Sequence, residues 1–212
     1  MQIVLVRHGA TDWNLERRCQ GSSDRDLSAV GIRQADEIAA LLSSENVSAI
    51  YASDLKRARR TAEAIGRRHN LPVLTEARIR ELDHGHLEGL TFNEIKKDFG
   101  EFLTRWRTEP AELQVPGGER FVDVAERAWS ALQQIVERHT GADNIVVVSH
   151  NFPIVGIVCR ITGTHLNHYR DFHLDPCGIS RLQCNGDRRW QVTHVNGQEY
   201  SARADHLEAQ PR

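Results

Sequence analysis

Short apolar runs alternate along the chain with stretches whose apolar residues recur at helical spacing. Residues 3–6 and 145–148 are unbroken runs of bulky side chains, which is typical of strands buried on both faces of a parallel sheet. Apolar residues recur every three or four positions after Ser28 and, most clearly, between Phe121 and Val136, which predicts amphipathic helices. This alternation of strands and helices predicts an α/β fold, a three-layer αβα sandwich around a mostly parallel sheet.

Local signals give the elements approximate limits. Strands are predicted at residues 3–6, 47–52, 71–75, 145–148, 179–184 and 190–195, and helices are predicted to end near residues 42, 69, 136 and 161. Ser28, Ser53 and Asp54 are the N-cap residues expected for the first two helices. Asn185 and Gly186 predict a turn that joins the last two strands into a hairpin.

Two segments lack a clear periodicity. Residues 11–26 are polar and are expected to form a loop that folds over the end of the first strand. Glycines and prolines break residues 76–119 into short helical pieces, which we interpret as an insertion that covers a site. We therefore expect a single domain of residues 1–197, followed by a polar tail of residues 198–212.

Composition narrows the class of protein. The chain has 212 residues, 40% of them hydrophobic, which suits one well-buried domain, and its formal net charge of −2 gives no global attraction to nucleic acid or to an anionic membrane. The four cysteines form no CxxC pair or metal-binding spacing, which favours a reducing cytoplasm. No signal region precedes the first strand, and no run approaches the roughly 18 apolar residues of a membrane span. A soluble cytoplasmic protein is expected.

Cations and imidazoles follow three of the predicted strands. Arg7 and His8 come after the first strand, Arg57 lies in the first turn of the helix after the second, and His150 ends the run at 145–148. Because the carboxyl ends of parallel strands meet at one crevice, these groups are expected to converge. Arginine forks bind phosphate oxygens bidentately, and phosphoryl transfer needs such positive groups around its three equatorial oxygens. The pattern predicts a phosphate site.

His8 is the candidate nucleophile, because no Ser, Cys or Asp lies in a recognised nucleophile turn or metal loop near these strand ends. A neutral imidazole can attack phosphorus and form a phosphohistidine, and a backbone carbonyl of a nearby turn is expected to hold its other nitrogen. Glu81, which follows the third strand, is the candidate acid for the leaving alkoxide and base for the incoming water. The alternative for Glu81 is a surface carboxylate paired with Arg78 or Arg80.

An ordered set of motifs covers roughly residues 3 to 150. It consists of Leu5-Val6-Arg7-His8-Gly9, Trp13-Asn14, Ser53-Asp54-Leu55-Lys56-Arg57-Ala58, Glu81 with Gly85 and Glu88-Gly89, Gly117-Gly118-Glu119, and Val148-Ser149-His150. In this order the motifs resemble the histidine phosphatase superfamily, which has the phosphoglycerate-mutase-like fold. The resemblance implies that His8 is phosphorylated, that Arg7, Arg57 and His150 bind the phosphate, and that Glu81 donates the proton. It also implies that Asn14 borders the phosphoryl group and that no metal or other cofactor is used.

The branch of the family is suggested by softer similarities. Mutases of this family are usually longer, so the compact span from Glu81 to His150 favours a phosphatase. Residues 83–85, 102–110 and 117–119 are similar to metal-independent phosphoserine phosphatases, which makes phosphoserine one candidate substrate. Residues 7–21 are also similar to broad-specificity and α-ribazole phosphatases. A phosphoglycerate mutase remains the alternative within the family, and a non-catalytic module that binds phospho-ligands is the rival from another class.

Substrate recognition is assigned to the 76–119 insertion and to the loop around Gln20. Gln20, Gly21, His84 and Glu119 are the candidate contacts to a small phosphorylated metabolite. Asp83, His84 and His86 could instead form a metal cluster, although no further ligands follow at a defined spacing. The sequence leaves the substrate and the oligomeric state open, a homodimer included.

Overall fold

The computed structural model describes residues 1–139, 143–185 and 189–200. Seven strands form one sheet in the order β3-β2-β4-β1-β5-β6-β7. The strands are β1 (Gln2–Arg7), β2 (Ala49–Ala52), β3 (Val73–Thr75), β4 (Asn144–Ser149), β5 (Ile179–Cys184), β6 (Trp190–Val195) and β7 (Gln198–Glu199). The first four in this order are parallel, while β5, β6 and β7 are antiparallel to their neighbours. The expected mostly parallel core is confirmed.

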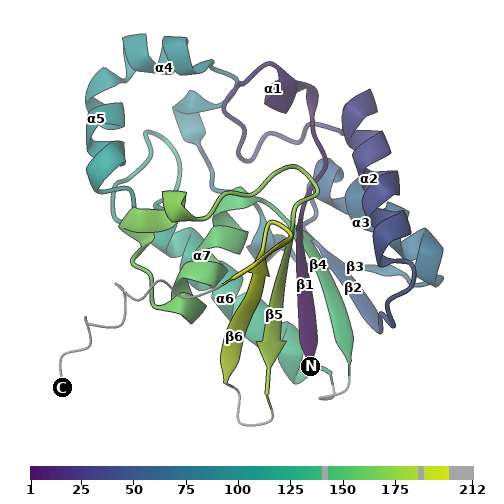
Figure 1. The fold of residues 1–212 in the computed structure, drawn as a ribbon. Helices are drawn as coiled ribbons and strands as arrows, with labels where there is room; N and C mark the ends of the chain where they lie inside the picture. The colour runs from purple at the N-terminus through teal and green to yellow at the C-terminus, as the bar shows by residue number, and fades with distance from the viewer. Residues whose placement is uncertain (140–142, 186–188, 201–212) are drawn as a thin grey trace, which may run out of the picture.

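Helices cover both faces of the sheet (Figure 1). One face carries α2 (Ala29–Leu42) and α3 (Lys56–His69), and the other carries α6 (Phe121–Glu137) and α7 (Asn151–Thr162). Alternate residues of the central strand β1 supply the two cores: Val4 and Val6 pack toward α2 and α3, whereas Ile3 and Leu5 pack toward α6 and α7. Burial on both faces explains why this strand is an unbroken apolar run, and the three layers confirm the predicted sandwich.

Short elements gather beyond the carboxyl ends of the strands, at the top of Figure 1. They are α1 (Asp12–Leu15), the 3-10 turns η1 (Ala77–Ile79) and η2 (Gly85–Leu87), α4 (Phe92–Asp98) and α5 (Gly100–Thr108). A further 3-10 segment, η3 (Leu166–Asp171), follows α7. The segment interpreted as an insertion thus folds into η1, η2, α4 and α5. None of the helices in the described part of the chain is long and apolar enough to cross a membrane.

Several local expectations need correction. The 11–26 segment is not wholly a loop, because Thr11 and Asn14 form a capping box that starts α1. Ser28 caps α2 as expected, but neither Ser53 nor Asp54 occupies the N-cap of α3, which is Leu55. The side chain of Asp24 supplies the missing acceptor by binding the backbone N–H of Lys56 at 2.7 Å. A cap that comes from a distant loop leaves no local pattern in the sequence.

The limits of some strands also differ. Strand β2 begins at Ala49 instead of residue 47, and β3 begins at Val73, one residue after the proline that lacks an N–H for the ladder. The predicted hairpin exists as the antiparallel pair β5 and β6, although Gly186 of its turn lies outside the described residues. The expected tail begins with β7, and residues 201–212 are likewise outside the described part.

Candidate active site

The two candidate imidazoles lie side by side because their strands are neighbours. Strands β1 and β4 pair in parallel with Arg7 opposite Ser149, so the next residues, His8 and His150, leave the sheet together. The His8 N–H donates to the Ser149 carbonyl at 3.0 Å, and the two ring centroids are 5.0 Å apart. Both side chains are almost fully buried. The convergence expected from the strand ends is therefore present for both histidines.

Arg57 completes a buried cluster with the two histidines. Its Nε–H is shared between His8 Nε2 and His150 Nδ1, each at 3.2 Å. Its two terminal nitrogens donate to backbone carbonyls of the loop before α2, Nη1 to Ser23 at 2.8 Å and Nη2 to Gly21 at 2.7 Å. Burial lowers the pKa of Arg57 to about 10, which still leaves the guanidinium charged at neutral pH.

The hydrogen bonds of His8 fix its tautomer. A carbonyl oxygen can only accept, so the 2.7 Å contact between Nδ1 and the Gly9 carbonyl makes Nδ1 the protonated nitrogen. The lone pair is then on Nε2, on the side of Arg57. Burial, followed by the charges of Arg57 and Arg7, holds the pKa of His8 well below its usual value. A neutral imidazole with an unprotonated nitrogen is the form that can act as a nucleophile once an entering ligand replaces the Arg57 contact, and the expected turn carbonyl is confirmed.

Glu81 is buried beside this cluster, 6% exposed. Its Oε1 accepts from the backbone N–H groups of Leu82 at 2.9 Å and Phe152 at 3.0 Å, and its Oε2 accepts from Asn151 at 3.0 Å. The carboxyl group thus lies at the N-terminus of α7, directly after His150, where its oxygens accept from backbone N–H groups that have no partner within the helix.

The surface alternative for Glu81 is wrong, because both arginines that could pair with it have other partners. Arg78 binds Glu76 at 2.7 Å, and Arg80 binds Asp54. Neither guanidinium is left to hold the Glu81 carboxylate.

Comparison with known proteins gives the family. A sequence model of the histidine phosphatase superfamily (branch 1) matches residues 3–198. The chain belongs to this family. Phosphoserine phosphatase 1 of Hydrogenobacter thermophilus is 37% identical over 196 residues, which are 92% of each protein. Phosphoglycerate mutase-like protein 4 of Arabidopsis thaliana is 35% identical over 88% of this chain and 93% of its own.

Solved structures agree with the sequence relatives. A mycobacterial glucosyl-3-phosphoglycerate phosphatase in complex with VO3 has a TM-score of 0.85 and 30% identity, covering 93% of this chain and 99% of its own. The family and these neighbours indicate that the chain is a phosphatase, and the predicted phosphoglycerate-mutase-like fold is confirmed.

Most of the unsatisfied buried polar atoms among the described residues of this histidine phosphatase belong to predicted site residues. Six buried side-chain nitrogen or oxygen atoms in the described part of the chain have no hydrogen-bond partner, and four belong to predicted site residues. These four are Arg7 Nε, Gln20 Nε2, His84 Nδ1 and His150 Nε2. Because buried polar groups are nearly always satisfied, such a concentration is typical of a ligand site. His150 Nδ1 already accepts from Arg57, so its Nε2 carries the proton and can donate to an anion.

The predicted substrate contacts have different surroundings. Asn14 closes the capping box of α1, where its side-chain oxygen accepts from the Thr11 N–H at 3.0 Å. Gln20 is held through its oxygen, which accepts from the Thr11 hydroxyl at 2.7 Å. Gly21 packs so tightly that a Cβ there would lie 2.4 Å from the Leu82 carbonyl oxygen, so only glycine fits.

Of the remaining two contacts, only His84 keeps a free polar atom. Its ring lies 5.4 Å from the Phe152 ring, and burial lowers its pKa. Both carboxylate oxygens of Glu119 accept from Arg127, at 3.1 and 2.9 Å, so Glu119 serves the protein's own packing in this arrangement. As for the metal alternative at Asp83 and His86, the structure described here contains no group of three or more His, Cys, Asp or Glu side chains that could hold a metal ion.

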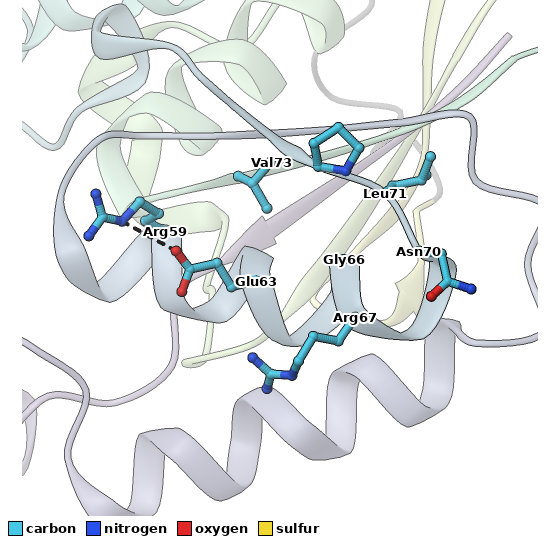
Figure 2. Close-up of a pocket in the computed structure, with 8 residues that line it drawn as sticks. Arg59, Glu63, Gly66, Arg67, Asn70, Leu71 and Val73 are labelled. Atoms are coloured by element: carbon cyan, nitrogen blue, oxygen red, sulfur yellow. Dashed lines mark ion pairs between the residues drawn. The ribbon is translucent and has the colours of Figure 1, made fainter.

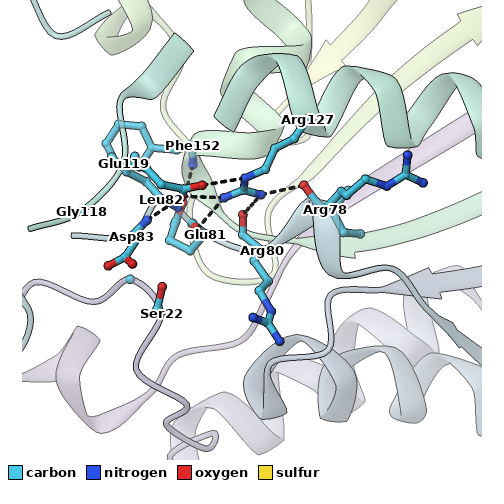
Figure 3. A network of polar contacts seen from close by, with 12 residues as sticks. Ser22, Arg78, Arg80, Glu81, Leu82, Asp83, Gly118, Glu119, Arg127 and Phe152 are labelled. Atoms are coloured by element: carbon cyan, nitrogen blue, oxygen red, sulfur yellow. Dashed lines mark hydrogen bonds and ion pairs between the residues drawn. The ribbon is translucent and has the colours of Figure 1, made fainter. Parts of the chain in front are cut away.

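Two residues that were not predicted as site residues hold the loops of the site. Glu88 accepts from the backbone N–H groups of Ser22 at 2.6 Å and Ser23 at 2.7 Å. It therefore anchors the same loop whose backbone carbonyls accept from Arg57. Arg127 holds the segment that carries Glu81 (Figure 3). Glu88 was part of a quoted motif, so a signal existed for it. Arg127 lies at a polar position of an amphipathic helix, which is where a solvated arginine is normally expected.

Proposed function

We propose that the protein hydrolyses a small-molecule phosphomonoester through a phosphohistidine on His8. The observation that carries the proposal is the state of this imidazole: Nδ1 is tied to the Gly9 carbonyl, and Nε2 offers its lone pair 3.2 Å from the buried guanidinium of Arg57. The candidate nucleophile His8 and the candidate anion-binding cation Arg57 are thus in direct contact, and both are buried. This pairing suits attack on a phosphorus atom whose oxygens the cation holds.

The first step uses Arg7, Arg57 and His150 to bind the phosphoryl oxygens. His8 Nε2 then forms a bond to phosphorus as the bond from phosphorus to the substrate's ester oxygen breaks, and Glu81 gives that oxygen its proton. In the second step Glu81 takes a proton from water, the resulting oxygen attacks phosphorus, and the N–P bond breaks to release inorganic phosphate. One carboxyl group serves both steps because it is returned to its protonated form when the phosphohistidine is hydrolysed.

Catalysis without a metal ion is part of the proposal. Two guanidinium groups and the Nε2–H of His150 supply the positive charge and hydrogen-bond donors that transferring phosphoryl groups require. Activity is expected to persist in the presence of a chelator. Complete loss that a divalent ion restores would instead favour a metal site near His84.

Phosphoserine is the first substrate to test, because a relative that shares 37% identity is named a phosphoserine phosphatase. The mycobacterial neighbour acts, by its name, on glucosyl-3-phosphoglycerate, and its complex with VO3 supports an oxyanion pocket in this fold. A mutase is the second candidate, which the name of the Arabidopsis relative favours. Sugar phosphates, phosphoglycerates and α-ribazole phosphate complete the panel.

The deciding experiment measures release of inorganic phosphate across this panel and traps the phosphoenzyme for mass spectrometry. Wild type is expected to release phosphate and to carry phosphate on His8. His8→Ala should abolish both while the fold stays intact, whereas His165→Ala, at an exposed histidine, should behave as wild type. An isomerised phosphoglycerate without phosphate release would favour the mutase. Failure to turn over any compound would favour the non-catalytic binding module.

We also propose the setting in which the enzyme works. A single domain of residues 1–197 would carry the site under the 76–119 segment, and the four free cysteines suit a reducing cytoplasm. Sedimentation equilibrium tests the homodimer that the sequence left open.

A further inference from the structure

Arg127 on α6 uses every N–H of its guanidinium within one small network (Figure 3). Nη1 donates to the carbonyls of Arg78 at 2.6 Å and Arg80 at 2.7 Å. Nη2 donates to the carbonyl of Glu81 at 2.9 Å and to Glu119 Oε2 at 2.9 Å, and Nε donates to Glu119 Oε1 at 3.1 Å. A guanidinium has five N–H donors, so this side chain is fully satisfied and has a single possible orientation.

Glu119 extends the network to the other side of Glu81. Its Oε2 also accepts from the backbone N–H of Asp83 at 3.0 Å, and its own N–H donates to the Asp83 carbonyl at 3.0 Å. The pair of Arg127 and Glu119 therefore fixes the chain on both sides of Glu81, at Arg80 and at Asp83. Both partners are only partly exposed, 21% and 33% at the side chain, so water screens the ion pair less than on an open surface.

The segment so held has no regular structure of its own. Residues 80–84 belong to neither a helix nor a strand, so no ladder of backbone hydrogen bonds fixes their place. The Glu81 carboxylate nevertheless has to meet the N–H groups of Asn151 and Phe152 on α7. Arg127 connects α6 to the backbone of this segment, while the carboxylate of Glu81 connects it to α7.

We propose that Arg127, together with Glu119, is the positioning residue for Glu81: it sets where the carboxyl group stands when a proton passes to the leaving alcohol. The inference rests on the proposed function of Glu81. Displacement of a catalytic group by about 1 Å can cost on the order of a hundredfold in rate. Because Arg127 donates to backbone carbonyls instead of the Glu81 side chain, and makes no hydrogen bond to His8 or Arg57 in the described structure, it acts on the proton-transfer geometry.

The test compares two phosphomonoesters that differ in their need for a proton. Dinitrophenolate leaves unprotonated, whereas the alkoxide of an alkyl phosphate needs the acid. Arg127→Met is expected to slow phosphohistidine formation from the alkyl phosphate by about a hundredfold. With 2,4-dinitrophenyl phosphate it should leave the rate of the initial burst within about twofold of wild type, followed by slower turnover because Glu81 must also activate water.

Arg120→Met is the matched control. Arg120 lies at the start of the same helix, is more exposed at 41%, and binds Asp123 and Glu112 without touching residues 78–83. The Arg120→Met variant should form phosphohistidine from both substrates at the wild-type rate. Equal loss on the two substrates in Arg127→Met would show a merely structural role and overturn the proposal, as would no loss on either.

Three more variants keep the test decisive. Should Arg127→Met not fold, the same substrate ratio is measured on Arg127→Lys and Glu119→Gln, each of which retains part of the network and should show a smaller change in the same direction. Glu81→Gln distinguishes failure of the proposed acid role of Glu81 from failure of the positioning role of Arg127. If it shows no dependence on the leaving group, the acid role in the proposed function fails; if it does and Arg127→Met does not, only the positioning role fails.

Discussion

Helix α3 supplies arginines to two regions, one in which the guanidinium is buried and one in which it is exposed and paired with a carboxylate. Near its N-terminus, Arg57 is fully buried and binds two imidazoles and two backbone carbonyls. On the solvent side of the same helix, Arg59 in the first turn and Arg67 in the last turn line an open groove with Glu63, Gly66 and residues 70–73 (Figure 2). There Arg59 pairs with Glu63 at 3.4 Å and Arg67 with Asp36 at 3.5 Å.

The difference shows that arginines around a concavity do not by themselves make an anion site. In the groove each cation has a carboxylate beside it and water around it, so little attraction is left for a ligand. At Arg67, in the last turn of α3, the helix C-terminus also favours cations over anions. Among the described residues Arg57 forms no ion pair, and its neutral histidine neighbours cannot cancel its charge. In the proposed function, the phosphoryl group of the substrate balances this charge.

The largest effect expected from this contrast is on catalysis. Arg57→Gln should lower kcat/KM by about a thousandfold, because removing one preorganised donor at a developing charge commonly costs a hundred- to a thousandfold and here the cation is lost as well. Arg59→Gln, two positions along the same helix, should change kcat/KM by less than about twofold. Steady-state kinetics on the best substrate of the panel measures both. A similar loss in the two variants would break the distinction between the regions.

A second prediction concerns Thr61, one helical turn after Arg57 on the buried face of α3. Its hydroxyl accepts from the Gly9 N–H at 3.1 Å and donates to the Arg57 carbonyl at 2.8 Å. Thr61→Val keeps the shape but leaves a buried N–H without an acceptor, which costs about 1–3 kcal/mol of unfolding free energy. Urea denaturation measures the loss. Thr104→Val, on the exposed part of α5, is the control and should stay within about 0.5 kcal/mol.

Thr61 also marks how far the sequence alone could predict this site. Strand ends and helix starts are local patterns, and topology then brings Arg7, His8, Arg57 and His150 together without any knowledge of side-chain contacts. The position of Thr61 within an apolar helix face predicts only burial. Its use as an acceptor depends on where the turn at Gly9 passes, which no local pattern specifies.

The same limit explains the network around Glu81. Glu119 was predicted as a substrate contact, and nothing in its neighbourhood along the chain points to Arg127, eight residues later, as the partner of both its oxygens. Three of the groups that Arg127 binds are backbone carbonyls, which every residue possesses and which therefore carry no sequence signal. The residues at the strand ends and the helix start were thus predictable, whereas those that hold them in place were not.

A third prediction follows from the neutral state of the two buried histidines. Burial, and then the charge of Arg57, holds the pKa of His8 and of His150 well below the usual value of 6.5. Below pH 6.5 the two histidines bind protons in the unfolded chain but stay neutral in the folded protein. The free energy of unfolding should therefore fall as the pH is lowered toward the folded pKa values. The slope is at most about 1.4 kcal/mol per pH unit for each histidine.

Urea midpoints between pH 7 and pH 5 measure this slope. His8→Asn removes one of the two titrating groups and should flatten the curve, whereas His165→Ala, at an exposed histidine, should leave it unchanged. Identical slopes in all three proteins would mean that the buried site does not disfavour the protonated imidazole. Burial would then no longer explain why the site at Arg57 differs electrostatically from the exposed groove at Arg59 and Arg67.

The smallest effect is expected at the groove. Arg67 and Asp36 are 68% and 59% exposed at the side chain, and ion pairs in this setting contribute about 0–1 kcal/mol. Arg67→Gln should therefore change the free energy of unfolding by less than about 0.5 kcal/mol and leave the inhibition constant of inorganic phosphate unchanged. Arg57→Gln, measured beside it, should weaken phosphate inhibition strongly. If Arg67→Gln weakened it as well, the carboxylates around the groove would not neutralise its cations, and the burial of Arg57 could no longer account for the choice of site.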